Sequence, residues 1–169
     1  QLARLVGAHE VATAVAVAVD LLARELALLV EPYEIGAAVA VAATAVVALR
    51  QCGLSERKAE YLRDLAAHFT SGALDPKGWR KLDDEALIAA LVEVKGIGRW
   101  TAEMFLIFHE LRADVLPVDD IGLQRAVALH YHDGRRVAPA TLRKLALEWR
   151  PWRSVATWYL WRSLDPVPV

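Results

Sequence analysis

The chain has 169 residues, of which 56% are hydrophobic, 24% charged and 8% aromatic, and its formal net charge is −1. This composition is typical of a folded globular protein, and the length suits one compact domain. A single cysteine, Cys52, excludes an intrachain disulfide, a four-cysteine iron–sulfur cluster and a multi-cysteine zinc site. The near-neutral charge creates no global positive field, so a nucleic-acid partner has to be inferred from local charge.

The longest uncharged apolar segment spans residues 35–49 and consists mostly of alanine and valine. Its 15 residues fall short of the roughly 20 that a membrane-spanning helix needs, so we expect a buried helix. The chain opens at Gln1 without a basic segment that leads into an apolar run and a cleavage site. We therefore expect a cytoplasmic protein.

Apolar residues recur at helical spacing along the whole chain, whereas the alternation typical of strands is absent. These patterns predict an all-α fold. Ser55, and either Asp83 or Asp84, are expected to cap helix starts. The predicted helices cover about 2–29, 36–50, 56–70, 84–94, 100–112, 121–131, 139–149 and 152–163.

Residues 1–48 contain alanine- and valine-rich runs that approach low-complexity sequence, and they lack the polar variety of residues 50–169. Three interpretations stay open: a tightly packed helix pair, an engineered stretch, or a region of weakly assigned residue identities. Candidate functional residues are therefore sought further along the chain.

Residues 86–112 predict a helix, a turn at Val94-Lys95-Gly96-Ile97-Gly98 and a second helix that opens at Arg99. Two glycines allow a sharp turn, and Ile97 is expected to lie between the helices. The N–H groups at the start of the second helix would then face outward, where they bind a phosphate oxygen well. The alternative is an ordinary glycine-capped turn between helices.

About twenty residues after this turn comes the run Pro117-Val118-Asp119-Asp120, directly before the helix predicted from Ile121. Aspartate is a preferred capping residue at helix N-termini, and for Asp119 we favour this capping role.

A glycine turn followed at this distance by Pro117-Val118-Asp119-Asp120 resembles the helix-hairpin-helix DNA glycosylase superfamily. Within it, residues 95–102 and 149–154 are similar to 3-methyladenine DNA glycosylase II enzymes, and the resemblance covers residues 50–169. It implies a single domain over 1–169, folded as a compact two-lobed helical bundle with a cleft between the lobes. One lobe would contain roughly residues 30–112, and the other residues 1–29 and 113–169.

The resemblance implies that Asp120 holds the catalytic carboxylate, which would stabilise an oxocarbenium-like sugar and orient the attacking water. It also implies an aromatic substrate site at Trp100 and Trp161, because indole faces attract the cationic ring of an alkylated purine. We include Met104 in this predicted substrate site. The remaining tryptophans, Trp79, Trp149, Trp152 and Trp158, are assigned mainly to packing. The predicted DNA-binding residues are Lys95, Gly96, Ile97, Gly98, Arg99 and Thr101.

Trp100 stands where bifunctional relatives carry a lysine nucleophile, so we expect base release without strand cleavage. No cofactor is expected, apart from a monovalent cation at the turn when DNA is bound. His109, His130 and His132 do not predict a metal site, since His130 and His132 lie two apart and face different sides of a helix.

Seven basic residues between Gly134 and Arg162 oppose only Glu148, which predicts either a DNA-binding face or an ordinary solvated one. The candidates for the side chain that wedges into the duplex are Leu54 and a residue in the N-terminal part of the chain. The second turn, residues 51–55, supplies either a phosphate contact or only a helix cap.

Together these features predict a monofunctional DNA glycosylase of base-excision repair that hydrolyses the N-glycosidic bond of alkylated purines. Its partner would be double-stranded DNA with alkylated bases, and it would act as a monomer of bacterial type, associated with the nucleoid. The alternative is a non-catalytic helix-hairpin-helix module that only binds DNA. A helical scaffold that binds protein is a third reading, which leaves the aspartate and tryptophans unexplained.

Overall fold

The computed structural model describes residues 33–165, and every regular element in this range is a helix. The all-α prediction is therefore confirmed, while the helix predicted at 2–29 lies outside the described residues. The helices, with η for a 3-10 helix, are α2 (Tyr33–Ala43), α3 (Val46–Gln51), α4 (Glu56–Thr70), η2 (Pro76–Lys81), α5 (Asp84–Val92), α6 (Arg99–Phe108), α7 (Ile121–Tyr131), α8 (Pro139–Leu145), η3 (Ala146–Trp149) and α9 (Arg153–Arg162).

Three of the α-helices begin where a side chain accepts a hydrogen bond from a backbone N–H group of the first turn. The Ser55 hydroxyl accepts from the Lys58 N–H at 3.3 Å, and Asp83 Oδ1 accepts from the Ala86 N–H at 2.8 Å. Both caps were predicted, with Asp83 rather than Asp84 in the capping position. The third cap, before α7, belongs to the candidate site.

The single helix predicted over residues 36–50 is wrong, because the chain forms α2 and α3 with a break at Thr44 and Ala45. The Thr44 hydroxyl donates to the Ala40 carbonyl at 2.6 Å, and Ala45 has an extended backbone with ψ of 144°. Threonine offers the backbone this local alternative to the helical ladder, which a pattern of apolar spacing does not register.

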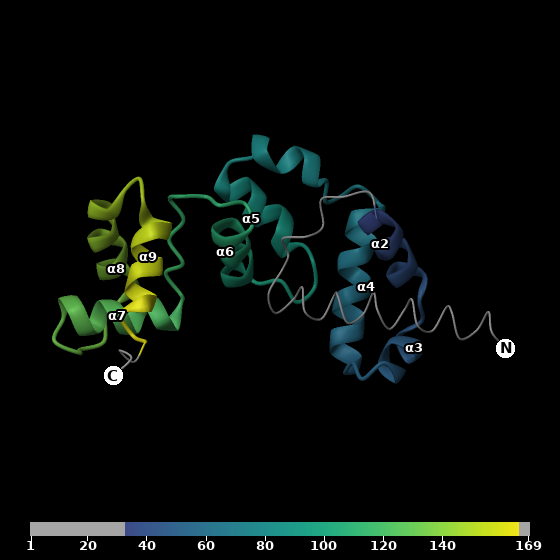
Figure 1. Cartoon of the computed structure of the whole chain (residues 1–169), viewed down its shortest axis with the longest axis horizontal. Helices are drawn as coiled ribbons and strands as arrows, with labels where there is room; N and C mark the ends of the chain where they lie inside the picture. Colours follow the sequence, from purple (N-terminus) through teal and green to yellow (C-terminus); the bar gives the residue numbers. More distant parts are fainter. Residues whose placement is uncertain (1–32, 166–169) are drawn as a thin grey trace. The chain divides into compact units, whose positions relative to one another are not determined.

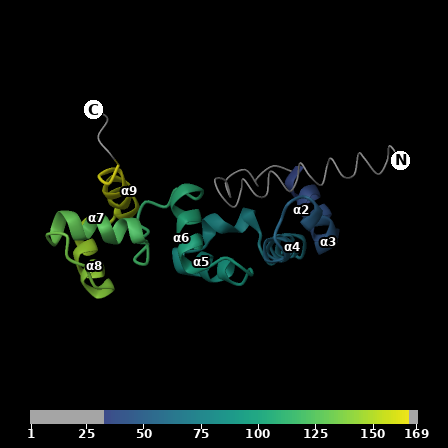
Figure 2. The same cartoon turned by 90° about the horizontal axis from the view of Figure 1, so that it is seen from below.

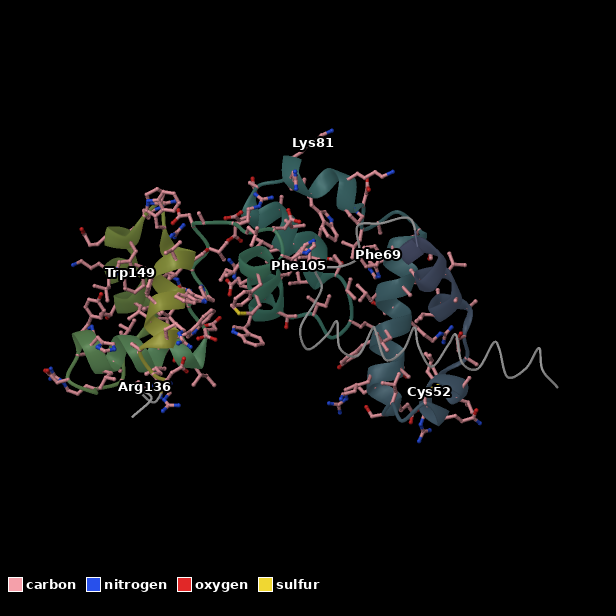
Figure 3. The ribbon with its side chains drawn as sticks, in the orientation of Figure 1. Cys52, Phe69, Lys81, Phe105, Arg136 and Trp149 are labelled. Carbon is pink, nitrogen blue, oxygen red and sulfur yellow. The ribbon has the colours of Figure 1, made fainter. Side chains whose placement is uncertain are left out.

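The chain divides into two compact units, one that ends at Gly98 and one that begins at Arg99. In the first unit α2 and α3 pack against α4, as Figures 1 and 2 show from two directions. Cys52, a free exposed cysteine, lies at the turn between α3 and α4 (Figure 3). The core of this packing consists of Val41, Leu49, Leu54, Ala59, Leu62 and Ala66.

Leu54 is a buried member of this core, so its assignment as a duplex wedge is wrong. It follows a turn at Gly53 and points its side chain inward, whereas a wedge has to be exposed. The Ser55 cap next to it agrees with the simpler interpretation of residues 51–55 as a helix start.

In the second unit α7 packs against α9, and α8 and η3 lie next to each other. Trp149, marked in Figure 3, is partly buried against the core of this unit, and its ring lies 6.2 Å from that of Tyr131. The core of the second unit contains Val118, Leu123, Val127, Val137 and Leu142. The lobe boundaries expected from the sequence stay a prediction.

The packing role predicted for the other tryptophans holds for Trp79, which is 3% exposed, and is wrong for two others. Trp152 and Trp158 are 59% and 45% exposed. The buried residues of α9 are the small Ser154 and Thr157, so Trp158 lies on its exposed side, while Trp152 precedes the helix as its N-cap. None of the helices described in the chain is long and apolar enough to traverse a bilayer.

Candidate functional site

The carboxylate of Asp120 receives three hydrogen bonds and is 8% exposed. Its Oδ1 accepts from the Trp161 indole N–H at 2.7 Å and from the Leu123 backbone N–H at 2.6 Å. Its Oδ2 accepts from the Trp100 indole N–H at 2.9 Å. Three N–H donors therefore stabilise one negative charge at the N-terminus of α7, where the helix dipole also favours an anion.

Asp120 itself is the N-cap of α7, so the preference for Asp119 as the capping residue is wrong. Asp119 is exposed, whereas the Asp120 carboxylate lies at the distance from Leu123 that a cap requires. The capping bond fixes the carboxylate from the backbone side, and the two indoles fix it from α6 and α9.

Aromatic rings surround this carboxylate. Trp100 is 49% exposed, and the Phe108 ring stacks on that of Trp161 with centroids 5.9 Å apart and an angle of 16°. Met104, which lies between Trp100 and Phe108 on α6, is partly buried. Sequence reasoning missed Phe108, although its spacing of four from Met104 and eight from Trp100 places all three on one helix face.

Asp114, which precedes Asp120 by six residues, binds arginine side chains at the start of α9. Arg153 donates through Nε to Oδ1 at 2.6 Å and through Nη2 to Oδ2 at 2.9 Å, and Arg150 adds a bond of 3.2 Å to Oδ2. The Ser154 hydroxyl donates to the Arg112 carbonyl at 2.6 Å and accepts from the Val115 N–H at 3.0 Å. We call Asp114, Arg150, Arg153 and Ser154 the Asp114 cluster.

The Asp114 cluster ties α9 to the segment that leads to Asp120. The hydrogen bond from Arg153 is the main reason that the pKa of Asp114 lies below its ordinary value, and Arg150 adds to this effect. Arg150 and Arg153, counted from sequence as part of a DNA-binding face, are thus held by an acidic partner in the fold.

The predicted turn at residues 94–98 is present in the first unit and has two different glycines. Gly96 has a φ of +87°, and a Cβ there would lie within the ring of Tyr61, so only glycine fits. Gly98 has no positive φ, and a Cβ there would meet nothing within 4 Å. The backbone constraint in this turn therefore lies at Gly96 and not at Gly98.

Helix α4 holds this turn through Asp64 as well as Tyr61. Asp64 Oδ2 accepts from the Lys95 backbone N–H at 2.8 Å. Ile97 is buried, as predicted, while Lys95, Gly96 and Gly98 are exposed. The turn therefore presents backbone to solvent in a conformation set by α4.

Arg99 and Thr101, the other predicted DNA-binding residues, open α6. Arg99 Nε donates to Oε1 of the buried Glu103 at 2.9 Å, which compensates the burial of that carboxylate. Thr101 is partly buried.

Most of the basic residues between 134 and 162 have acidic partners. Four of the seven pair with a carboxylate: Arg150 and Arg153 with Asp114, Arg135 with Asp133, and Arg162 with Asp165. The local positive charge is therefore smaller than the sequence count indicates. The remaining cations in this segment are Arg136, Arg143 and Lys144.

Of the histidines, His130 shares a hydrogen bond of 2.7 Å with Ser163, and His109 stacks on Phe105 with ring centroids 4.6 Å apart. Burial lowers the pKa of His109, and the neighbouring Glu110 partly offsets this. Within residues 33–165, no three histidine, cysteine, aspartate or glutamate side chains form a group that could hold a metal ion.

The fold and site define a class of protein: helical, with a glycine turn between two helices and an indole-flanked aspartate at a helix N-terminus. The chain belongs to the HhH-GPD superfamily of base excision DNA repair proteins, whose family model matches residues 13–151.

Relatives and solved structures agree with this membership. DNA-3-methyladenine glycosylase 1 of Schizosaccharomyces pombe is 36% identical over 116 residues, which cover 68% of this chain and 51% of that protein. The crystal structure of DNA-3-methyladenine glycosidase from Bacillus halodurans matches with a TM-score of 0.71 and 32% identity, over 93% of this chain and 74% of that chain.

A structure of the Schizosaccharomyces pombe 3-methyladenine DNA glycosylase Mag1 in complex with abasic DNA matches with a TM-score of 0.68 and 25% identity, over 96% of this chain and 84% of that one. The predicted resemblance to 3-methyladenine glycosylases is confirmed by these similarities. The chain spans about half the length of the curated relatives that it matches.

Proposed function

We propose that this protein is a monofunctional DNA glycosylase that hydrolyses the N-glycosidic bond of alkylated purines, of the 3-methyladenine type, in base-excision repair. The observation that carries the proposal is the Asp120 carboxylate, held by two indole N–H groups and a helix N-terminus. The similarity to proteins named as 3-methyladenine glycosylases, one of them solved with abasic DNA, supports it.

The chemistry follows from the charge on an alkylated purine. Its glycosidic bond is already weakened, so the protein has to admit the flipped base and stabilise the positive charge that develops on the sugar. A carboxylate fixed from three sides needs little reorganisation for this task, and it can also orient the attacking water.

The aromatic rings near Asp120 would hold the base. Trp100 and Phe108 are half exposed, and a cationic ring on an indole face gains about 0.5–2 kcal/mol by cation–π attraction, depending on desolvation. Phe108 stacks on one face of the Trp161 indole, so a base would use these rings together as an aromatic site. We assign Met104, on the same face of α6, to this substrate site.

DNA binding would use the turn at residues 95–98 and the first turn of α6, with Arg99 and Thr101. Exposed backbone groups of Gly96 and Gly98 suit the close approach of a phosphate. Their carbonyl oxygens are also ligands that a monovalent cation accepts, and such an ion would offset phosphate charge there. We propose a monomer that acts on double-stranded DNA in the cytoplasm, at the nucleoid.

The test is incubation with duplex DNA treated with a methylating agent, followed by chromatography of the released bases. We expect free 3-methyladenine from the unmodified protein and none above background from Asp120→Asn. Asparagine caps helices as well as aspartate does, so its Oδ1 can keep the bonds from Leu123 and Trp161, while its amide nitrogen loses the bond from the Trp100 indole N–H. Circular dichroism of the variant checks that it is folded. The matched control is Asp119→Asn, which changes an exposed neighbour and should excise at the unmodified rate.

Binding to undamaged and methylated duplex without base release by the unmodified protein would favour the non-catalytic module instead. The reaction products also test whether the enzyme is monofunctional or bifunctional. Because Trp100 replaces the lysine nucleophile of bifunctional relatives, we expect intact strands and no adduct trapped by borohydride. A trapped adduct would contradict the monofunctional assignment.

A further inference from the structure

We propose that Gly122 is a positioning residue: the absence of a side chain at this position admits the Trp161 indole to the Asp120 carboxylate. The inference rests on the proposed function for its consequence in catalysis. Its structural content, the contact of Gly122 with Trp161, can be tested without any activity.

Gly122 is the second residue of α7, in a helical conformation that needs no glycine. A Cβ at this position would lie 3.0 Å from Trp161 Cδ1, 3.1 Å from Trp161 Nε1 and 3.1 Å from Asp120 Oδ1. These are the two groups of the shortest indole bond in the site, at 2.7 Å. The edge of the Trp161 ring therefore lies where a side chain at Gly122 would otherwise be.

Helix propensity alone would favour alanine here, because glycine in a helix carries more backbone entropy into the unfolded state. Gly122 has no positive φ that would demand glycine, in contrast to Gly96. The crowding by Trp161 and Asp120 is the constraint that the structure shows at this position.

The effect of a side chain at Gly122 would be selective. Trp161 and the Leu123 N–H share Oδ1 of Asp120, whereas Trp100 donates to Oδ2. A methyl group at Gly122 would crowd both Asp120 Oδ1 and the Trp161 indole. Because the carboxylate is held by the Leu123 cap and the Trp100 bond, the indole would move outward by a few tenths of an ångström, and a branched side chain would displace it. The bond from Trp100 would remain.

The structural test uses the indole N–H cross-peaks of the 15N-labelled full chain in NMR spectra. The peaks of Trp161 and Trp100 are identified by their loss in Trp161→Phe and Trp100→Phe. In Gly122→Ala and then Gly122→Val we expect the Trp161 peak to move progressively upfield as its hydrogen bond lengthens, while the Trp100 peak stays in place. The control is Gly78→Ala, where the added Cβ has its nearest neighbour at 3.9 Å.

The kinetic test uses single-turnover release of 3-methyladenine. We expect Gly122→Val to lower the rate by about tenfold or more, the effect of losing one hydrogen bond to a charged group, with Gly122→Ala intermediate and Gly78→Ala unchanged. If Gly122 acts through Trp161, then Gly122→Ala in the Trp161→Phe background should add little.

An unmoved Trp161 peak in both Gly122 variants would overturn the proposal, as would fully additive rate losses in the double variant. If Gly122→Val does not fold, as judged by circular dichroism, Gly122→Ala decides by the same two criteria. Absence of excision by the unmodified protein would count against the proposed function, while the shift of the Trp161 peak would still confirm or refute the positioning role.

Discussion

Asp120 combines a helix cap with the carboxylate expected to carry the chemistry. The family resemblance pointed to this aspartate, whereas the residue pattern assigned the cap to its neighbour Asp119. The tryptophans changed in a similar way: Trp100 and Trp161 were expected to offer their faces to a base, and both also donate their N–H edges to Asp120. The bonds of the two indole N–H groups to Asp120 were not evident from residue chemistry, which had suggested only a role for the ring faces.

The two glycines of the turn lead to a prediction at the same scale. Gly96→Ala should reduce the free energy of unfolding by about 1–3 kcal/mol, because the backbone has a positive φ and Tyr61 occupies the space of the new methyl group. Gly98→Ala should leave stability almost unchanged. Urea unfolding of both variants is the measurement.

The affinity of the Gly98→Ala variant for undamaged duplex DNA is a second measurement on this turn. We expect Gly98→Ala to weaken binding, since its methyl group would point into the open space where a phosphate approaches. Loss of stability in Gly98→Ala, with none in Gly96→Ala, would refute the division of roles between the two glycines.

At the scale of elements, the Asp114 cluster connects α9 to the segment before α7. Residues 149–154 supported the resemblance to related glycosylases, and their two arginines were among the seven cations considered for a DNA-binding face. Their guanidinium groups instead bind Asp114, while Ser154 binds the backbone on both sides of it. The placement of Trp161, eight residues after Arg153 on the same helix, depends on this anchorage.

The cluster predicts a pH dependence of stability. A carboxyl group whose pKa is lower in the folded state stabilises the fold above its unfolded pKa, and this contribution is lost as the pH falls through the folded pKa. Asp114→Asn should therefore lower the free energy of unfolding by about 1–2 kcal/mol at neutral pH. The difference from the unmodified protein should shrink below a pH of about 4.

Urea unfolding of both proteins at pH values from neutral to acidic tests this prediction. Asp133→Asn is the control, because its partner Arg135 is exposed and such surface pairs contribute little. A constant difference between Asp114→Asn and the unmodified protein at all pH values would show that the carboxylate charge is not what matters.

For the whole molecule, a net charge of −1 and the pairing of four of seven cations between 134 and 162 leave a modest electrostatic attraction for DNA. Binding would then depend more on backbone groups at the turn than on a broad cationic face. Salt dependence of binding measures this balance, because each phosphate neutralised by a cation releases counterions.

We expect Arg143→Gln to reduce the slope of log affinity against log salt for undamaged duplex by about 0.9, the value for one phosphate contact. Arg162→Gln should change the slope less, since Arg162 already binds Asp165 at 2.6 Å. Fluorescence anisotropy at several salt concentrations provides the slopes. Equal changes for the two variants would show that pairing with Asp165 does not withhold Arg162 from DNA.

The sequence by itself determined the helical class, the cap at Ser55, the glycine turn and the superfamily, and it narrowed the cap of α5 to Asp83 or Asp84. These features depend on interactions between residues near in the chain, such as periodic apolar faces and caps two or three residues away, which spacing encodes directly. The break at Thr44 and the cap of α7 also depend on nearby residues, but each had two local alternatives. At Thr44 a continuous helix competed with a break, and at α7 Asp119 competed with Asp120.

Tertiary structure alone decided the partners of the site. Asp120 meets Trp100 and Trp161 across 20 and 41 residues, and Asp114 meets Arg153 across 39. Such contacts depend on how helices pack, and no spacing in the sequence specifies which donor reaches which carboxylate oxygen. For the same reason the crowding that a side chain would meet at Gly96 and Gly122 became visible only from the positions of Tyr61 and Trp161.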